Sequence, residues 1–111
     1  AECWDGIPDH GLYGQLLRDA ATPADLLATI MAPGFLAQDQ WQAQIQAQIQ
    51  LRAAVYVYAD YLSDEQLRAA LLLPCRDIAV TIAELRRHYG PDTTICVLPE
   101  GPQTIPFVRT H

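Results

Sequence analysis

Two short apolar segments constrain the fold of this chain more than any other feature. They are residues 54–59, Ala-Val-Tyr-Val-Tyr-Ala, and residues 94–98, Thr-Ile-Cys-Val-Leu. Both are almost wholly apolar, which is typical of strands in a parallel sheet that is covered on both faces. Because helix signals lie between the two segments, they predict a βαβ unit with a right-handed crossover.

Helix start signals mark the rest of the chain. Thr22 is placed as an N-cap and Pro23 as the first helical residue behind it. Ser63 and Gln66 have the spacing of a capping box. The predicted helices cover residues 12–19, residues 23–31, a short segment opened at Ser63, and residues 77–89.

The segment Trp41–Leu51 reads W-Q-A-Q-I-Q-A-Q-I-Q-L and carries two conflicting patterns. Strict alternation of apolar and polar residues predicts an amphipathic strand. Yet glutamine and alanine favour helices over strands, and a helix would bury Trp41, Ile45 and Ile49 together on one face. Asp39 stands where an N-cap is expected. We therefore predict a helix and keep the strand as the alternative.

The combined pattern predicts one α/β domain over residues 1–111. We expect a small three-layer unit with a short, mostly parallel sheet flanked by helices. The chain opens with Ala1-Glu2-Cys3, which reads like the end of a strand cut from something longer. A further strand upstream is therefore part of the expectation, and the domain is expected to be the C-terminal part of a larger two-domain enzyme.

Composition excludes several classes of function. The net charge of −6 argues against a nucleic-acid surface. All seven basic residues are arginines, so this chain supplies no lysine nucleophile or Schiff base. No apolar segment is long enough to span a membrane, and no signal peptide is recognised, so we expect a cytoplasmic protein with no membrane partner. The cysteines are expected to be free thiols; they are Cys3, Cys75 and Cys96.

Two places carry candidate functional residues. Asp5, Asp9 and His10 share one loop and could supply an acid, a base or metal ligands, although a solvated turn is the favoured interpretation. Trp41 follows a polar run in the first turn of its predicted helix. An indole there can project into a cleft and stack on a flat ligand, with core packing as the competing interpretation.

Several segments together resemble the C-terminal region of the nickel-dependent lactate racemase family. The run Gln38-Asp39-Gln40-Trp41-Gln42-Ala43-Gln44 resembles the D-Q-W-x-x-Q helix start of that family, and the resemblance covers nearly the whole chain. The order and spacing of the motifs carry the resemblance. The other matching segments are the A-E-C-W-D-G-I-P opening, residues 55–62 as the following strand and turn, and residues 95–101 with 104–106 as the closing strand and P-x-G turn.

The resemblance implies an isomerase with two domains and an active site in the cleft between them. A nickel-pincer cofactor derived from nicotinate is tethered there to a lysine. It takes the Cα hydrogen of a 2-hydroxy acid as a hydride while a histidine takes the hydroxyl proton. These catalytic and metal-binding residues belong to the N-terminal catalytic domain, so none is assigned to this chain, and we expect no cofactor bound by it alone. The implied partners are that domain and a small 2-hydroxy acid.

The resemblance places Trp41 on the wall of the substrate and cofactor pocket. Gln40 is predicted beside it at the rim, and His10 is kept as a third pocket residue. Two alternatives stay open. A stand-alone α/β module would bind a small ligand near residues 60–64 and 99–103, at the carboxyl ends of its strands. A structural or dimerising domain would use the Trp41 helix as a packing face against a second copy.

Overall fold

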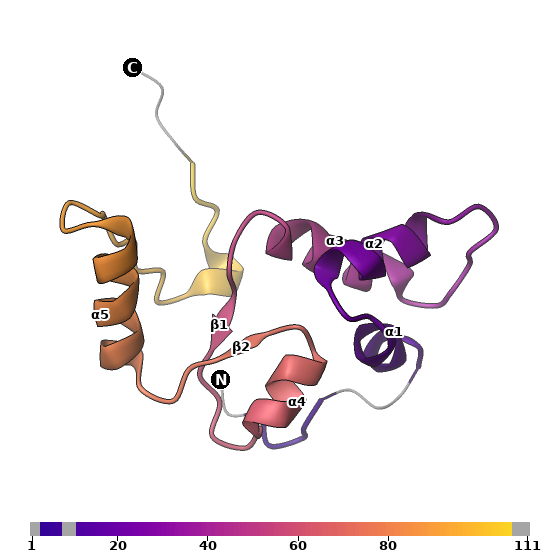
Figure 1. Ribbon diagram of the computed structural model, residues 1–111, viewed down its shortest axis with the longest axis horizontal. Coiled ribbons are helices and arrows are strands. Elements are labelled where there is room, and N and C mark those ends of the chain that lie inside the picture. The colour runs from indigo at the N-terminus through magenta and orange to yellow at the C-terminus, as the bar shows by residue number, and fades with distance from the viewer. Residues whose placement is uncertain (1–2, 8–10, 108–111) are drawn as a thin grey trace.

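A computed structural model describes residues 3–7 and 11–107 of the chain. Helices α1–α3 group at one side, α5 stands at the other, and the two strands lie between them with α4 (Figure 1). This arrangement confirms a small α/β fold with a parallel sheet. The elements are α1 Tyr13–Asp19, α2 Pro23–Met31, α3 Gln40–Gln50, β1 Tyr56–Val57, α4 Asp64–Ala69, β2 Leu73–Pro74, α5 Ile78–Tyr89 and the 3₁₀ turn η1 Gly101–Gln103.

The sheet consists of β1 and β2 in parallel, with Val57 opposite Pro74. The N–H of Leu73 donates to the carbonyl of Val55 at 3.0 Å, and the N–H of Cys75 donates to the carbonyl of Val57 at 2.9 Å. Since residues 73 and 75 make the ladder bonds, the nitrogen of Pro74 faces away from β1. Proline is tolerated in this edge strand because no ladder bond is lost.

The second strand was predicted in the wrong place. Residues 94–98 form no regular structure, and Ile95 and Val97 are exposed. The run that ends in Leu73-Pro74 lies beside β1 instead, so the crossover runs through α4 and not through the longer α5. Strand propensity measures the fit of a side chain onto a half-buried surface. The turn after α4 brings residues 73–75 to such a surface.

Helix α3 confirms the helical alternative for residues 41–51, but the predicted buried face is wrong. Ala43 and Ala47 are fully buried, whereas Trp41 is 59% exposed, Ile45 49% and Ile49 51%. Alanine lets the backbone of α3 approach α2 closely, which a larger side chain at the same position would prevent. The i, i+4, i+8 run of large apolar residues therefore marks a face that the described chain leaves uncovered.

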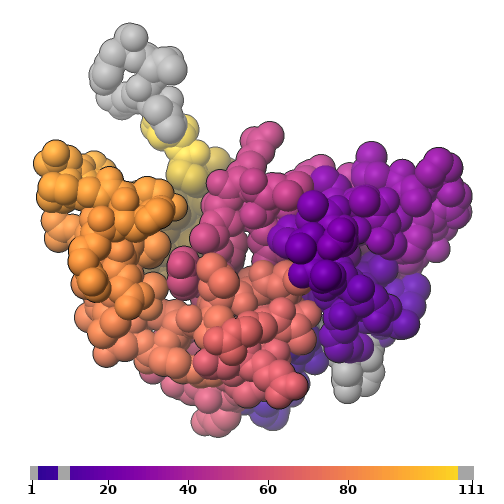
Figure 2. All heavy atoms as spheres, in the orientation of Figure 1, coloured from indigo at the N-terminus to yellow at the C-terminus, as the bar shows by residue number. Residues whose placement is uncertain are grey.

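Helix α5, like α3, carries large apolar side chains that are exposed. It begins as predicted, because the Asp77 side chain accepts a hydrogen bond from the N–H of Val80 at 2.9 Å. None of its residues is buried, and Ile78 and Val80 are exposed. On its inner side, Thr81 Oγ1 lies 3.2 Å from Cys75 Sγ. Figure 2 shows α5 separated by a notch from the half of the molecule that holds α1–α3.

The buried core forms two clusters, one between α1, α2 and α3 and one around α4. Ile7 and Leu72 pack against both clusters and so connect them. The first cluster contains Leu17, Leu26, Ile30, Ala43, Ala47 and Ala70, and the second contains Ala59, Leu62 and Leu67.

No helix in the described ranges is long and apolar enough to cross a membrane.

Arg76 connects the turn after β1 to α4. Its guanidinium donates to the carbonyls of Ala59 at 3.1 Å and Leu62 at 2.8 Å, and it pairs with Asp64.

We expect Arg76→Ala to lower the free energy of unfolding by about 1 kcal/mol, because two carbonyls lose their donor while the ion pair itself is half exposed. Arg68→Ala, which removes only the 3.7 Å pair with the same carboxylate, is the control. Equal urea midpoints for the two variants would show that the carbonyl bonds contribute nothing.

Candidate functional site

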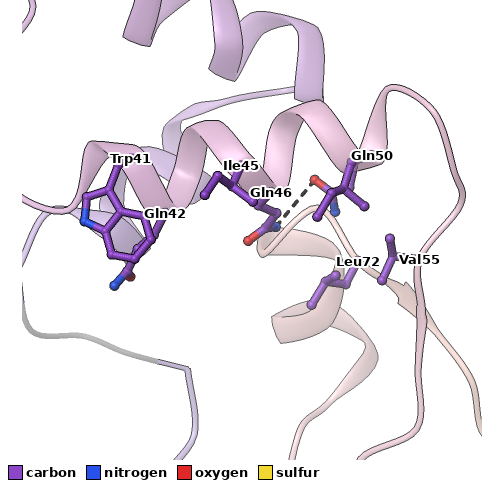
Figure 3. Close-up of a pocket in the computed structure, with 8 residues that line it drawn as sticks. Trp41, Gln42, Ile45, Gln46, Gln50, Val55 and Leu72 are labelled. Atoms are coloured by element: carbon purple, nitrogen blue, oxygen red, sulfur yellow. Dashed lines mark hydrogen bonds between the residues drawn. The ribbon is translucent and has the colours of Figure 1, made fainter. Parts of the chain in front are cut away.

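Trp41 stands at one end of a surface hollow of about 400 Å³. Helix α3 forms one wall, while Val55 before β1 and Leu72 before β2 form the facing wall (Figure 3). The lining consists of aliphatic side chains, one indole and side-chain amides, and none of its described residues is charged. Its members are Trp41, Gln42, Ile45, Gln46, Ile49, Gln50, Val55 and Leu72.

The turn before α3 determines where Trp41 starts. Asp39 has a left-handed backbone with φ of 62°, and its side chain makes no capping hydrogen bond. The predicted N-cap is therefore correct in position but not in its bonding. Gln40 closes this turn instead, because its Oε1 accepts from the N–H of Ala37 at 2.8 Å. The Gln40 side chain is thus turned back to the loop and is not among the residues lining the hollow, so its place at the rim stays a prediction.

Two of the three glutamines that line the hollow use their side-chain amides in hydrogen bonds within the domain. The Nε2 of Gln46 donates to the carbonyl of Ala70 at 2.8 Å, and its Oε1 accepts from the Tyr13 hydroxyl. Gln50 Nε2 donates to the carbonyl of Leu71. By contrast, the side chain of Gln42 has no hydrogen-bond partner within the described part of the chain, and its side-chain amide remains available at the rim.

Burial raises the pKa of the Tyr13 phenol above its ordinary value of 10.0. The folded chain then holds this proton more tightly than the unfolded chain, so the stabilisation is complete below about pH 10 and is lost as the pH rises further. We expect Tyr13→Phe to flatten the fall of the urea midpoint above about pH 10. The exposed Tyr89→Phe serves as control. An identical fall in both variants would contradict a role for Tyr13.

Of the three predicted loop candidates, only Asp5 lies among the described residues, and it does not line the hollow. Asp9 and His10 lie outside the described residues, so the assignment of His10 to the pocket stays a prediction. Asp5 is described and lines a separate depression beside Arg18 and Gln66. The structure therefore keeps Asp5 away from the hollow.

Polar groups at the carboxyl end of β1 are paired with one another. A hydrogen bond with the Asp60 carboxylate, strengthened by its negative charge, raises the pKa of Tyr58. Asp64 is paired with Arg76. In the described ranges, no group of three or more His, Cys, Asp or Glu side chains is placed to hold a metal ion. The uncharged hollow at Trp41 is therefore the strongest candidate site.

Residues 1–105 match the family described as the lactate racemase C-terminal domain. The chain belongs to this family. It is also 28% identical over 107 residues to the lactate racemase of Thermoanaerobacterium thermosaccharolyticum, a match that covers 95% of this chain and 25% of that protein. The chain thus spans about a quarter of the length of this curated relative. No solved structure matches it.

Sequence reasoning on this lactate racemase C-terminal domain singled out Trp41 for a substrate pocket, a role that stays a prediction, and it did not single out most of the other residues that line the hollow. Once residues 41–51 are assigned to a helix, positions four and eight after Trp41 share its side of the helix, which points to Ile45 and Ile49. Gln42, Gln46 and Gln50 form the neighbouring row of the helix and are not indicated by Trp41 alone. Val55 and Leu72 carry no comparable local signal. They reach the hollow only because β1 and β2 pair.

Proposed function

We propose that this domain forms one wall of the active-site cleft of a 2-hydroxy-acid racemase or epimerase, whose nickel-pincer cofactor is held by an N-terminal catalytic domain. The observation that carries the proposal is the exposed Trp41 on an uncharged hollow, in a chain of the lactate racemase C-terminal domain family. A large indole beside Ile45 and Ile49 costs free energy in water unless a ligand or another protein surface covers it.

The residues of this chain do not fit the role of cofactor holder. The sequence contains no lysine for a covalent tether, and the described residues offer no cluster of nickel ligands. Trp41 and Gln42 fit a different role, because an indole face stacks on a planar ring and an amide hydrogen-bonds at its edge. We assign the holding of the cofactor to the N-terminal domain and the covering of the cleft to this one.

The chemistry of the lining also determines which part of a 2-hydroxy acid this wall faces. Among the described residues, no arginine or histidine lines the hollow, so this part of the chain offers a substrate carboxylate no charged donor there. We infer that the carboxylate is bound elsewhere in the cleft. The apolar side chains of this wall exclude water from the reacting carbon, which a reaction that transfers hydride requires.

We place the enzyme in the cytoplasm. Cys3, Cys75 and Cys96 are all free thiols in the structure. Thiols persist unpaired in a reducing compartment, and this agrees with the proposed location.

Nickel content and intact mass of the full-length protein, co-expressed with cofactor-maturation proteins, test the proposal. We expect stoichiometric nickel, a lysine-linked mass adduct and interconversion of the two enantiomers of a 2-hydroxy acid. An unmodified mass without nickel, in a host that loads a control racemase, would contradict the proposal. Binding of a small acid by such a protein would favour a stand-alone binding module, and concentration-dependent dimerisation would favour a packing domain.

A further inference from the structure

We propose that Gln46 and Gln50 are positioning residues, which fix the two walls of the hollow relative to each other and so set the place of Trp41. The effect on catalysis rests on the proposed function, whereas the effect on geometry stands on hydrogen bonds within this chain. The proposal also gives a role to two of the glutamines in residues 41–51, which the function of Trp41 alone leaves unexplained.

The turn after α4 presents two carbonyls toward α3. The N–H of Leu72 donates to the carbonyl of Leu67 and the N–H of Leu71 to that of Arg68, each at 2.9 Å, which is the bonding of a Schellman motif. Leu71 has a φ of 60° at the position where such motifs favour glycine. At the end of a helix, the carbonyls of Ala70 and Leu71 lack partners within the helix and need donors from elsewhere.

Gln46 and Gln50 supply these donors from one side of α3, one helical turn apart. Gln46 donates to the Ala70 carbonyl at 2.8 Å, and Gln50 donates to the Leu71 carbonyl. The Gln46 amide also accepts from Tyr13, so α1, α3 and the turn after α4 meet at one side chain. In Figure 3 both amides lie between α3 and Leu72.

We infer that α3 keeps some freedom to rotate on α2, because the two helices meet through small side chains of α3. Its buried residues there are Ala43 and Ala47, whose side chains end at Cβ and therefore interlock little with a neighbouring helix. Two directional hydrogen bonds to consecutive carbonyls remove this freedom, because such bonds weaken steeply when they are bent. A rotation of about 20° would move a side chain at the helix surface, about 5 Å from the axis, by about 2 Å.

The same turn carries the facing wall. Leu72 follows directly after the Leu71 carbonyl that Gln50 binds, and it lines the hollow opposite α3. The two amides therefore span the hollow at its base and set its width. Without them, we expect Trp41 and Leu72 to sample several separations, and binding at the hollow to weaken.

The test compares the full-length enzyme with a variant that combines Gln46→Leu and Gln50→Leu. Leucine retains the bulk of the side chain and removes the amide. We expect kcat/KM to fall about 10-fold, mainly through a higher KM, because a misplaced wall loses binding to the ground state and the transition state alike. Gln48→Leu is the matched control, since Gln48 is exposed on the same helix and its side chain has no hydrogen-bond partner among the described residues. A control that loses as much activity would overturn the proposal.

A double-mutant cycle with Trp41→Ala separates positioning from general destabilisation. If the glutamines act through Trp41, removing them from the Trp41→Ala enzyme costs little further kcat/KM. Fully additive losses would overturn the proposal. Gln50→Lys keeps a donor for the Leu71 carbonyl and is expected to recover part of the kcat/KM that Gln50→Leu loses. If the combined variant does not fold, the single variants Gln46→Leu and Gln50→Leu are measured in its place.

Fluorine NMR of fluorotryptophan-labelled enzyme gives a readout that does not depend on activity. With the resonance of Trp41 assigned by Trp41→Phe, we expect it to shift or broaden when Gln46 and Gln50 are replaced and to stay in place in Gln48→Leu. An unchanged resonance would overturn the positioning role. If replacing the two glutamines shifts the resonance but the unsubstituted protein itself shows no racemase activity, the positioning role is confirmed and the proposed function is rejected.

Discussion

If the proposed function holds, replacing Trp41 with alanine in the full-length protein is expected to lower kcat/KM by about 30- to 150-fold and to leave the fold intact. Covering roughly 80 Å² of indole by substrate or cofactor is worth about 2 kcal/mol, and stacking adds up to about 1 kcal/mol. Each 1.4 kcal/mol corresponds to about a factor of ten in rate. The fold should tolerate the change because Trp41 belongs to neither core cluster.

Trp4→Ala is the matched control for this prediction. Trp4 is 74% exposed and does not line the hollow, so its loss removes an equal side chain from another part of the surface. Steady-state kinetics and urea midpoints are measured for both variants. An unchanged kcat/KM in Trp41→Ala would remove the specific site assignment, and an equal loss in Trp4→Ala would point to a general effect of exposed tryptophans.

Local signals in the sequence predicted the helices well because each acts within one turn. Thr22 Oγ1 accepts from the N–H of Asp25 at 3.1 Å, and Ser63 and Gln66 form both bonds of the predicted capping box. Residues 94–98 show the limit of such signals. Their composition suits a strand as well as that of β1 does, but strand formation depends on a partner that the local pattern does not contain.

The candidate site was predictable only in part. The family resemblance at Asp39-Gln40-Trp41 located the indole, and residues 1–105 match that family. Helical periodicity showed that Trp41, Ile45 and Ile49 share a face, but it does not say which face of a helix is covered. The contribution of the glutamines was hidden for a related reason. A pattern of polar residues does not distinguish amides exposed to water from amides that bind carbonyls of a distant turn.

The assignment of the buried face leads to the second large prediction. Ala47→Leu is expected to lower the free energy of unfolding by about 1–3 kcal/mol, because α2 leaves no room for three added carbons at a fully buried position. Ile49→Ala, by contrast, removes a half-exposed side chain and is expected to cost about 1 kcal/mol or less. The opposite ranking would follow from the face predicted by periodicity, on which Ile49 is buried.

The urea midpoints of Ala47→Leu and Ile49→Ala show which face of α3 is buried. Gln48→Leu shows whether a new leucine destabilises α3 when it is not buried. Gln48 is exposed next to Ala47, beside a surface depression that Leu27 also lines, so leucine there changes helix propensity little and stays at the surface. A midpoint for Ala47→Leu that falls well below both others would confirm that α3 buries its alanines. A larger fall of the urea midpoint for Ile49→Ala would mean that α3 buries the face that carries Trp41, Ile45 and Ile49. The hollow beside Trp41 would then be part of the packed core, because the side chains that line it would be the ones that stabilise the domain.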